Sequence, residues 1–221
     1  MQRHLAGLFS VWLVACAAIA AAEFWETKPF LEWSDREAQK MLADSPWAAV
    51  VSVALPPQLP AAAVAGGGGG RGGGDDTSFG PGPRRIRVGL SWRSAMPLKR
   101  AVVRMSVGQR GEPSAENQEF LARAEPSYVI AMSGLPAQYT RPGSGTTIEA
   151  FLRRDGKPPI PAGEAATQKG PEGMLLLIGF PRTDPLAIED GDVEFAFKVD
   201  RLEVKRKFKL RDMMFEGKLE L

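Results

Sequence analysis

The chain has 221 residues, with 28 Lys and Arg against 26 Asp and Glu, a net charge of +2, and a single His and a single Cys. Glycine (24) and proline (18) are abundant, yet together they stay below the roughly 25–30 % that marks wholly disordered chains. The length suits one domain, or one domain with an appendage. The near-neutral charge excludes a global field that would recruit nucleic acid or an anionic membrane surface.

The N-terminus has the pattern of an export signal. Arg3 and His4 precede an apolar run over residues 5–22, which ends in small residues before Glu23. We therefore predict a signal peptide at residues 1–22, cleaved near Ala22, and a secreted or periplasmic mature chain. The rival interpretation is a membrane anchor, because an apolar run of 18 residues is at the lower limit for crossing a bilayer.

A third interpretation concerns the one cysteine. Residues 13–16, Leu-Val-Ala-Cys, resemble a bacterial lipobox, in which Cys16 is acylated and becomes the mature N-terminus. A lipid on Cys16 would hold the protein on a membrane. Against this, residues 17–22 stay apolar, whereas a lipoprotein tether is normally polar. Membrane contact is thus expected only through the signal or a Cys16 lipid.

Cleavage of the signal peptide and lipidation of Cys16 both remove His4. Cys16 itself is lost in the first case and lipidated in the second. The mature chain would then lack both histidine and a free thiol. This excludes disulfides, histidine-ligated and thiolate metal sites, and nucleophiles that depend on Cys or on a Ser–His pair. We therefore predict a non-catalytic chain with no metal, no cofactor and no nucleic-acid partner.

Aromatic residues are dense in the segment after the predicted signal. We expect them to form a hydrophobic lid on the domain; the alternative is a stacking surface for sugars or a partner. They are Phe24, Trp25, Phe30, Trp33 and Trp47.

A capped helix is expected within the same segment. Ser34 and Glu37 form a capping box, because the hydroxyl and the carboxylate each satisfy an amide that the first turn leaves free. Ala38 and Met41 then share one helical face, and Pro46 ends the helix. Residues 48–55, rich in Val, predict a strand.

A low-complexity tract at residues 56–83 divides the chain. Polyglycine over Gly66–Gly74 maximises the entropy of the unfolded chain and offers no side chain to bury, so we predict a flexible loop. No Lys-Ser/Thr pair follows it, as a phosphate-binding loop would require. Residues 23–55 are too short to bury a core alone. We therefore predict one domain over residues 23–221, with the tract as a tolerated surface loop.

The middle of the chain alternates between strand and helix patterns. Residues 85–93 predict a strand, and Pro97 begins a helix in which Leu98, Ala101, Val102 and Met105 share a face. A short helix is expected over residues 114–124. Further strands or extended segments are expected over residues 128–132, 147–153, 158–161 and 174–180.

The clearest pattern lies near the C-terminus. Two alternating segments flank Asp200-Arg201, and a two-residue turn there pairs residues whose numbers sum to 401. Val199 then faces Leu202 on the apolar side, and acidic residues face lysines on the polar side. Arg206 opposite Phe195 interrupts the apolar face and indicates a bulge or an edge. Residues 215–221 would add a last strand.

These elements predict an α+β fold. We expect about seven or eight short, mostly antiparallel strands with about three helices and a C-terminal β-hairpin. A sheet with helices on one side, or a sandwich with helical additions, fits this set of elements.

Two basic regions are candidate ligand surfaces. The first combines positive charge with two tryptophans; because the chain is expected to be exported, an acidic polymer or an envelope protein is favoured as partner over nucleic acid. The second is a strip of Lys205, Lys207, Lys209 and Arg211 that would suit a polyanion, although lysines also protect a strand edge from aggregation. The first surface comprises Trp47, Arg85, Arg87, Trp92, Arg93, Lys99 and Arg100.

The alternative function is a carboxylate-dependent hydrolase of an envelope polymer, which needs two acids in one cleft. Residues 189–192 are acidic but lack the ligand spacing of a calcium loop. The available acids are Glu149, Asp155, Glu164, Glu172 and Asp184.

The segment after the predicted signal also carries a family motif. Its residues are Phe24-Trp25-Glu26, Lys28, Trp33-Ser34, Glu37, Met41-Leu42 and Asp44-Ser45-Pro46-Trp47. This opening resembles that of a family of uncharacterised secreted bacterial proteins, and residues 128–130, 180–185 and 205–210 resemble it too. The resemblance implies an exported bacterial protein and implies no activity. The glycine tract is not part of the pattern.

Overall fold

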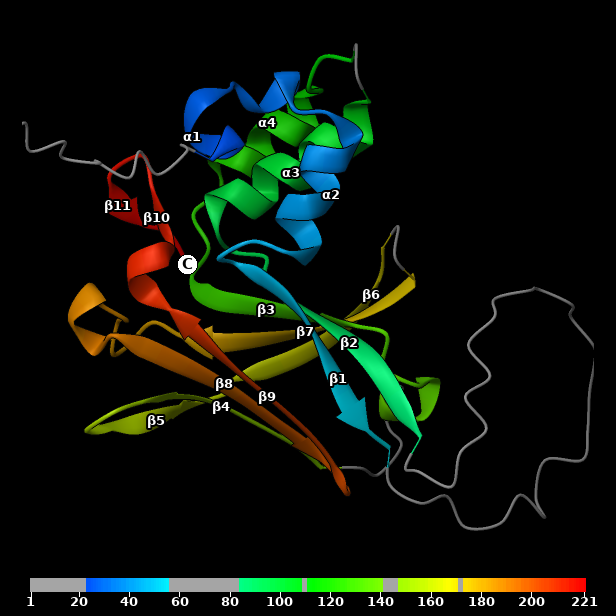
Figure 1. Cartoon of the computed structure of the whole chain (residues 1–221), viewed down its shortest axis with the longest axis vertical. Coiled ribbons are helices and arrows are strands. Elements are labelled where there is room, and N and C mark those ends of the chain that lie inside the picture. The colour runs from blue at the N-terminus through cyan, green and yellow to red at the C-terminus, as the bar shows by residue number, and fades with distance from the viewer. Residues whose placement is uncertain (1–22, 56–83, 109–110, 141–146, 171–172) are drawn as a thin grey trace, which may run out of the picture.

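The computed structural model of the chain describes residues 23–55, 84–108, 111–140, 147–170 and 173–221 (Figure 1). The predicted signal peptide with Cys16 and the predicted loop at residues 56–83 lie outside the described residues. Within the described ranges, no helix is long and apolar enough to cross a membrane.

Four α-helices and eleven strands in the described residues make up an α+β fold, as predicted. The helices are α1 (Phe24–Thr27), α2 (Asp35–Ala43), α3 (Met96–Val107) and α4 (Ala115–Ala122), with 3-10 turns η1 (Phe30–Glu32), η2 (Ala137–Tyr139), η3 (Ile188–Asp190) and η4 (Leu210–Asp212). The strands are β1 (Ala48–Ala54), β2 (Arg85–Trp92), β3 (Ser127–Ser133), β4 (Ile148–Arg154), β5 (Lys157–Pro161), β6 (Glu164–Gly170), β7 (Gly173–Pro181), β8 (Asp192–Val199), β9 (Leu202–Lys209), β10 (Met214–Phe215) and β11 (Lys218–Leu219).

The strands form two main sheets and a small hairpin. The first sheet has the order β1-β2-β3-β7-β6, the second β5-β4-β8-β9, and β10 pairs with β11. Every strand pair in the described part of the chain is antiparallel. Edge-to-face contacts join the two sheets, with ring centroids 5.7 Å apart for Trp92 and Phe208 and 6.2 Å apart for Phe180 and Phe195. The architecture is therefore a sandwich, with helices gathered at one end (Figure 1).

Local signals in the sequence predicted two elements in detail. Ser34 caps α2, and both hydrogen bonds of the capping box with Glu37 are present. Strands β8 and β9 pair in the predicted register, from Asp192 opposite Lys209 to Val199 opposite Leu202. The register runs without a shift through Arg206, so there is no bulge; β9 is instead the edge strand of its sheet.

The expected element counts are too low. Strand β6 was not expected, because its sequence, Glu-Ala-Ala-Thr-Gln-Lys-Gly, is polar and exposed and shows no apolar alternation. The expected last strand is a hairpin instead, since Glu216 and Gly217 adopt positive φ angles of 49° and 81° and turn the chain. The single-turn helix α1 brings the helices from three to four.

The face of α3 also differs from the expectation. Leu98 and Ala101 are buried as predicted, but Lys99 and Arg104 are buried with them. Acidic side chains from the start of α2 (Asp35) and from the segment after α4 (Glu125) meet these two cations, which is why a charged side chain can take a core position.

Candidate functional site

The predicted basic and aromatic surface does not exist as one surface. Trp47 and Trp92 are fully buried, so the expectation that they form an exposed platform is wrong. The Trp47 indole N–H donates to the Glu220 carbonyl oxygen at 2.7 Å, and the Trp92 ring packs edge-on against Tyr128. Both rings fill the core instead of facing a ligand.

The prediction that Lys99 belongs to an exposed surface is also wrong, because its side chain is buried. Its ammonium donates to the Arg123 carbonyl oxygen at 2.7 Å and pairs with Glu125 Oε1 at 2.8 Å. Burial opposes ionisation of Glu125, but hydrogen bonds and charge from Lys99 and Arg123 outweigh it and hold the pKa of Glu125 below its ordinary value. Lys99 therefore fastens α4 and the segment after it to α3.

The four arginines of the predicted surface do not form one group, although Arg85 and Arg87 share a face of β2. Arg85 and Arg87 are exposed on β2, and Arg85 donates to the Ser52 hydroxyl at 3.1 Å. Arg93 is half-buried after β2. Arg100 pairs with Glu216 at 2.7 Å and lies over the Phe215 ring at the helical end of the molecule.

Three of the four residues of the second basic region form one surface, whereas Arg211 lies beyond β9 in η4. Lys205, Lys207 and Lys209 are exposed and share one face of β9, because Val204 and Phe208 alternate with them and point into the core. We call these three residues the lysine row. Alternate residues of a strand lie about 6.8 Å apart, so the three lysines are attached at even intervals along the sheet edge.

The pairing of the lysine row differs from what its register suggests. Glu194 lies directly opposite Lys207, yet its carboxylate pairs with Arg153 of the other neighbouring strand at 3.5 Å. Asp192 lies opposite Lys209. Among the described residues, neither Lys207 nor Lys209 has an ion-pair partner, whereas Lys205 pairs with Glu203 at 2.6 Å.

A hollow of about 380 Å³ adjoins the lysine row on the outer face of the second sheet. It lies where the β4–β5 turn, the start of β8 and the end of β9 come together, and it contains side chains of both charges. Its lining residues are Arg153, Arg154, Asp155, Lys157, Pro159, Asp192, Glu194 and Lys207.

A cluster of charges, with Arg154 and Asp190 buried at its centre, supports this end of the sheet. The fully buried Arg154 side chain pairs with Asp184, and Asp190 binds Lys157 at 2.6 Å. The hydrogen bond from Arg154 lowers the pKa of Asp184. Burial opposes ionisation of Asp190, but Lys157 and the Ala187 amide hold its pKa below the ordinary value. The cluster fastens the β4–β5 hairpin to the segment after β7.

The acids considered for hydrolysis are placed on different elements. Glu149 lies on β4, Asp155 in the β4–β5 turn, Glu164 on β6 and Asp184 after β7, and all four are exposed. Asp155 lines the hollow, and Asp184 is engaged by Arg154. Glu172 lies outside the described residues.

No family model, curated protein or solved structure matches the chain. In the portion of the chain that the structure describes, no group of three or more His, Cys, Asp or Glu side chains could hold a metal ion. The resemblance to a family of secreted bacterial proteins stays a prediction.

Sequence reasoning missed the hollow and found only part of its lining. The lateral order Arg153, Glu194, Lys207 across β4, β8 and β9 creates it. The β8–β9 half of this order was visible in the hairpin pattern. The neighbourhood of β4 and β8 was not, because 37 residues separate the two strands and no short turn joins them.

Proposed function

We propose that the chain is an exported, non-catalytic domain that binds an anionic envelope or extracellular polymer along the lysine row. The observation that carries this proposal is the free state of Lys207 and Lys209 within the described residues, although acids lie directly opposite both. The export component rests on the sequence pattern of residues 1–22.

The shape of the site favours a polymer over a small molecule. The lysine row follows an edge strand on the outside of the sandwich, and the backbone positions of its lysines repeat about every 6.8 Å. A regular row of exposed ammonium groups suits a chain that carries an anion on each repeat. Each contact contributes little alone, so several must act together. Such binding weakens as salt screens the charges.

The test compares binding of heparin, used as a sulfated probe polymer, by the natural chain and by the double variant Lys207→Gln/Lys209→Gln. An exposed ion pair contributes about 0.2–1 kcal/mol, so we expect the double variant to bind heparin about 2- to 30-fold more weakly. Isothermal titration calorimetry at low salt measures this, and neutral dextran serves as the uncharged probe.

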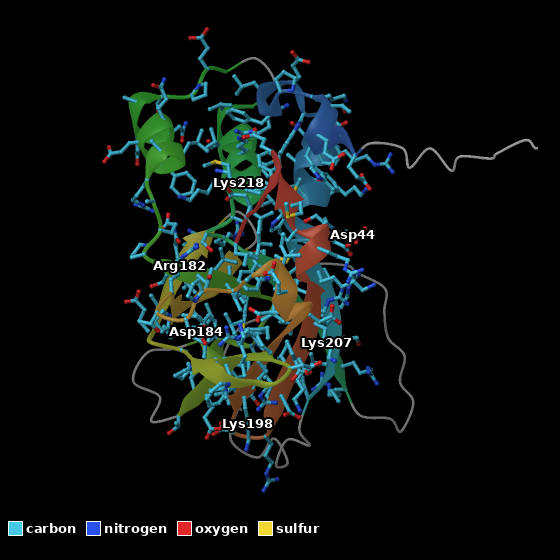
Figure 2. The ribbon with its side chains drawn as sticks, turned by 90° about the vertical axis from the view of Figure 1, so that its left-hand side faces the viewer. Asp44, Arg182, Asp184, Lys198, Lys207 and Lys218 are labelled. Carbon is cyan, nitrogen blue, oxygen red and sulfur yellow. The ribbon has the colours of Figure 1, made fainter. Side chains whose placement is uncertain are left out.

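Lys218→Gln is the matched control. Lys218 is exposed like the lysines of the row but lies on β11, nearer the helices, and pairs with Glu220 (Figure 2). We expect this variant to bind heparin like the natural chain. Equal heparin binding by the double variant and the natural chain would overturn the proposal, as would equal binding of dextran and heparin.

A further inference from the structure

The hollow beside the lysine row poses an electrostatic problem for a purely anionic ligand. Three carboxylates line it: Asp155 from the β4–β5 turn and Asp192 and Glu194 from β8. Lys207 lines the same hollow. A uniformly anionic polymer that follows the lysine row past Lys207 would bring its charges close to these three carboxylates. Like charges repel, so this part of the hollow disfavours such a polymer.

The existing ion pairs leave a defined set of charges for a ligand. Arg153 is occupied by Glu194 at 3.5 Å and Lys157 by Asp190 at 2.6 Å. Over the described ranges, Asp155 and Asp192 have no ion-pair partner, and neither has Lys207. The hollow thus offers one ammonium group and two carboxylates.

The carboxylates are suited to an organic cation. The described acids do not form a group that could hold a metal ion. A ligand ammonium needs only acceptor oxygens within hydrogen-bond reach, and two ionised carboxylates supply several. The volume of about 380 Å³ falls in the range of sites that hold a small organic group.

We propose that the hollow binds a repeat unit that carries both an ammonium group and an anionic group, such as an amino sugar next to an acidic substituent. Lys207 binds the anionic group, and Asp155 and Asp192 bind the ammonium group. Asp192 is the diagonal cross-strand neighbour of Lys207, at a typical separation of about 7–8 Å, which neighbouring groups of one repeat unit can span. This inference rests on the proposed function and specifies its polymer as zwitterionic.

The test compares heparin with N-desulfated heparin, in which a free ammonium group replaces each N-sulfate on the same backbone. If only Lys207 and Lys209 attract the polymer, the loss of sulfates weakens binding. We expect the natural chain instead to bind N-desulfated heparin at least as tightly as heparin. The double variant Asp155→Asn/Asp192→Asn is expected to reverse this order and to favour heparin by about tenfold, equivalent to about 1.4 kcal/mol.

Both substitutions are at exposed positions, and Asn before Gly suits the tight turn at Asp155-Gly156. Equal urea midpoints for the variant and the natural chain check that the fold is kept. The control is Asp44→Asn, an exposed acid at the end of α2, near the helices (Figure 2). We expect it to leave the order of the two polymers unchanged.

The outcomes separate the two proposals. If heparin binding depends on Lys207 and Lys209, but N-desulfated heparin binds more weakly and the Asp155/Asp192 variant changes both polymers equally, this inference is wrong and the proposed function stands. If neither polymer binds the natural chain, both are wrong.

Discussion

The capping box of α2 allows a quantitative prediction about a single carboxylate. Glu37 Oε2 accepts from the Ser34 amide at 2.8 Å, and Oε1 accepts from the Lys28 ammonium at 2.7 Å. The hydrogen bond from Lys28, followed by the one from the Ser34 amide, lowers the pKa of Glu37 from 4.5 to about 2. We predict that Glu37→Gln destabilises the protein, because Gln keeps an acceptor for the amide but loses the charge.

The magnitude follows from the shift and the exposure. A pKa lowered by this much corresponds to an upper limit of about 3 kcal/mol at 1.36 kcal/mol per unit. The Glu37 side chain is 22 % exposed and Lys28 is 45 % exposed, so solvent screens the interaction. Helix-capping contacts typically contribute about 0.5–2 kcal/mol. We therefore expect a loss of about 1 kcal/mol at pH 7.

The assay is urea denaturation at pH 7 and at pH 3, with Glu32→Gln, an exposed acid outside the capping box, as control. The folded-state pKa is lowered, so the stabilisation is present above pH 4.5 and is lost as the pH falls toward 2. The difference between the natural chain and Glu37→Gln should therefore shrink at pH 3. Equal stabilities at pH 7, or a difference that does not shrink, would refute the reasoning.

Two further predictions concern the core and the N-terminus. Glu125→Ala leaves the buried Lys99 ammonium with only carbonyl partners, so we expect the free energy of unfolding from urea denaturation to fall by about 2–3 kcal/mol. Adding Lys99→Met to the same chain should recover part of this loss. If it recovers none, Lys99 and Glu125 do not act as a pair. Mass spectrometry of the mature protein should find Glu23 as the first residue; an acylated Cys16 would show a lipoprotein, and an intact residue 1–22 segment would contradict cleavage.

The local features of this fold could be predicted from the sequence. The capping box at Ser34 and Glu37 and the register of β8 and β9 depend on residues close along the chain, and both are confirmed. Each has redundant signals: the hairpin had agreeing apolar and charge pairs, and the cap had two reciprocal partners.

The packing between elements distant along the chain could not be predicted from the sequence. Lys99 looked like a surface cation, because its half-buried partner Glu125 comes from beyond α4. Trp47 and Trp92 looked like a platform, because the partners that bury them lie on β10, β3 and β9. Burial of an aromatic or a paired charge is decided by which elements meet, and one chain's local pattern does not determine that.

In the candidate site too, the local feature was predictable from the sequence and the long-range feature was not. The strip that contains the lysine row was visible as an alternating pattern on one strand. The hollow was not, because it needs β4 beside β8, which brings the β4–β5 turn to the same end of the sheet as Lys207. The free state of Lys207 also depends on this neighbourhood, since Arg153 of β4 takes the carboxylate that the hairpin alone would assign to Lys207.

The salt dependence of heparin binding tests the central claim most directly. The logarithm of the affinity is measured against the logarithm of the salt concentration for the natural chain and for Lys207→Gln/Lys209→Gln. Each lysine that contacts a polymer anion adds about one to the slope, so we predict a slope that is smaller by about two in the double variant. An unchanged slope would show that the lysine row does not contact the polymer and would contradict the account.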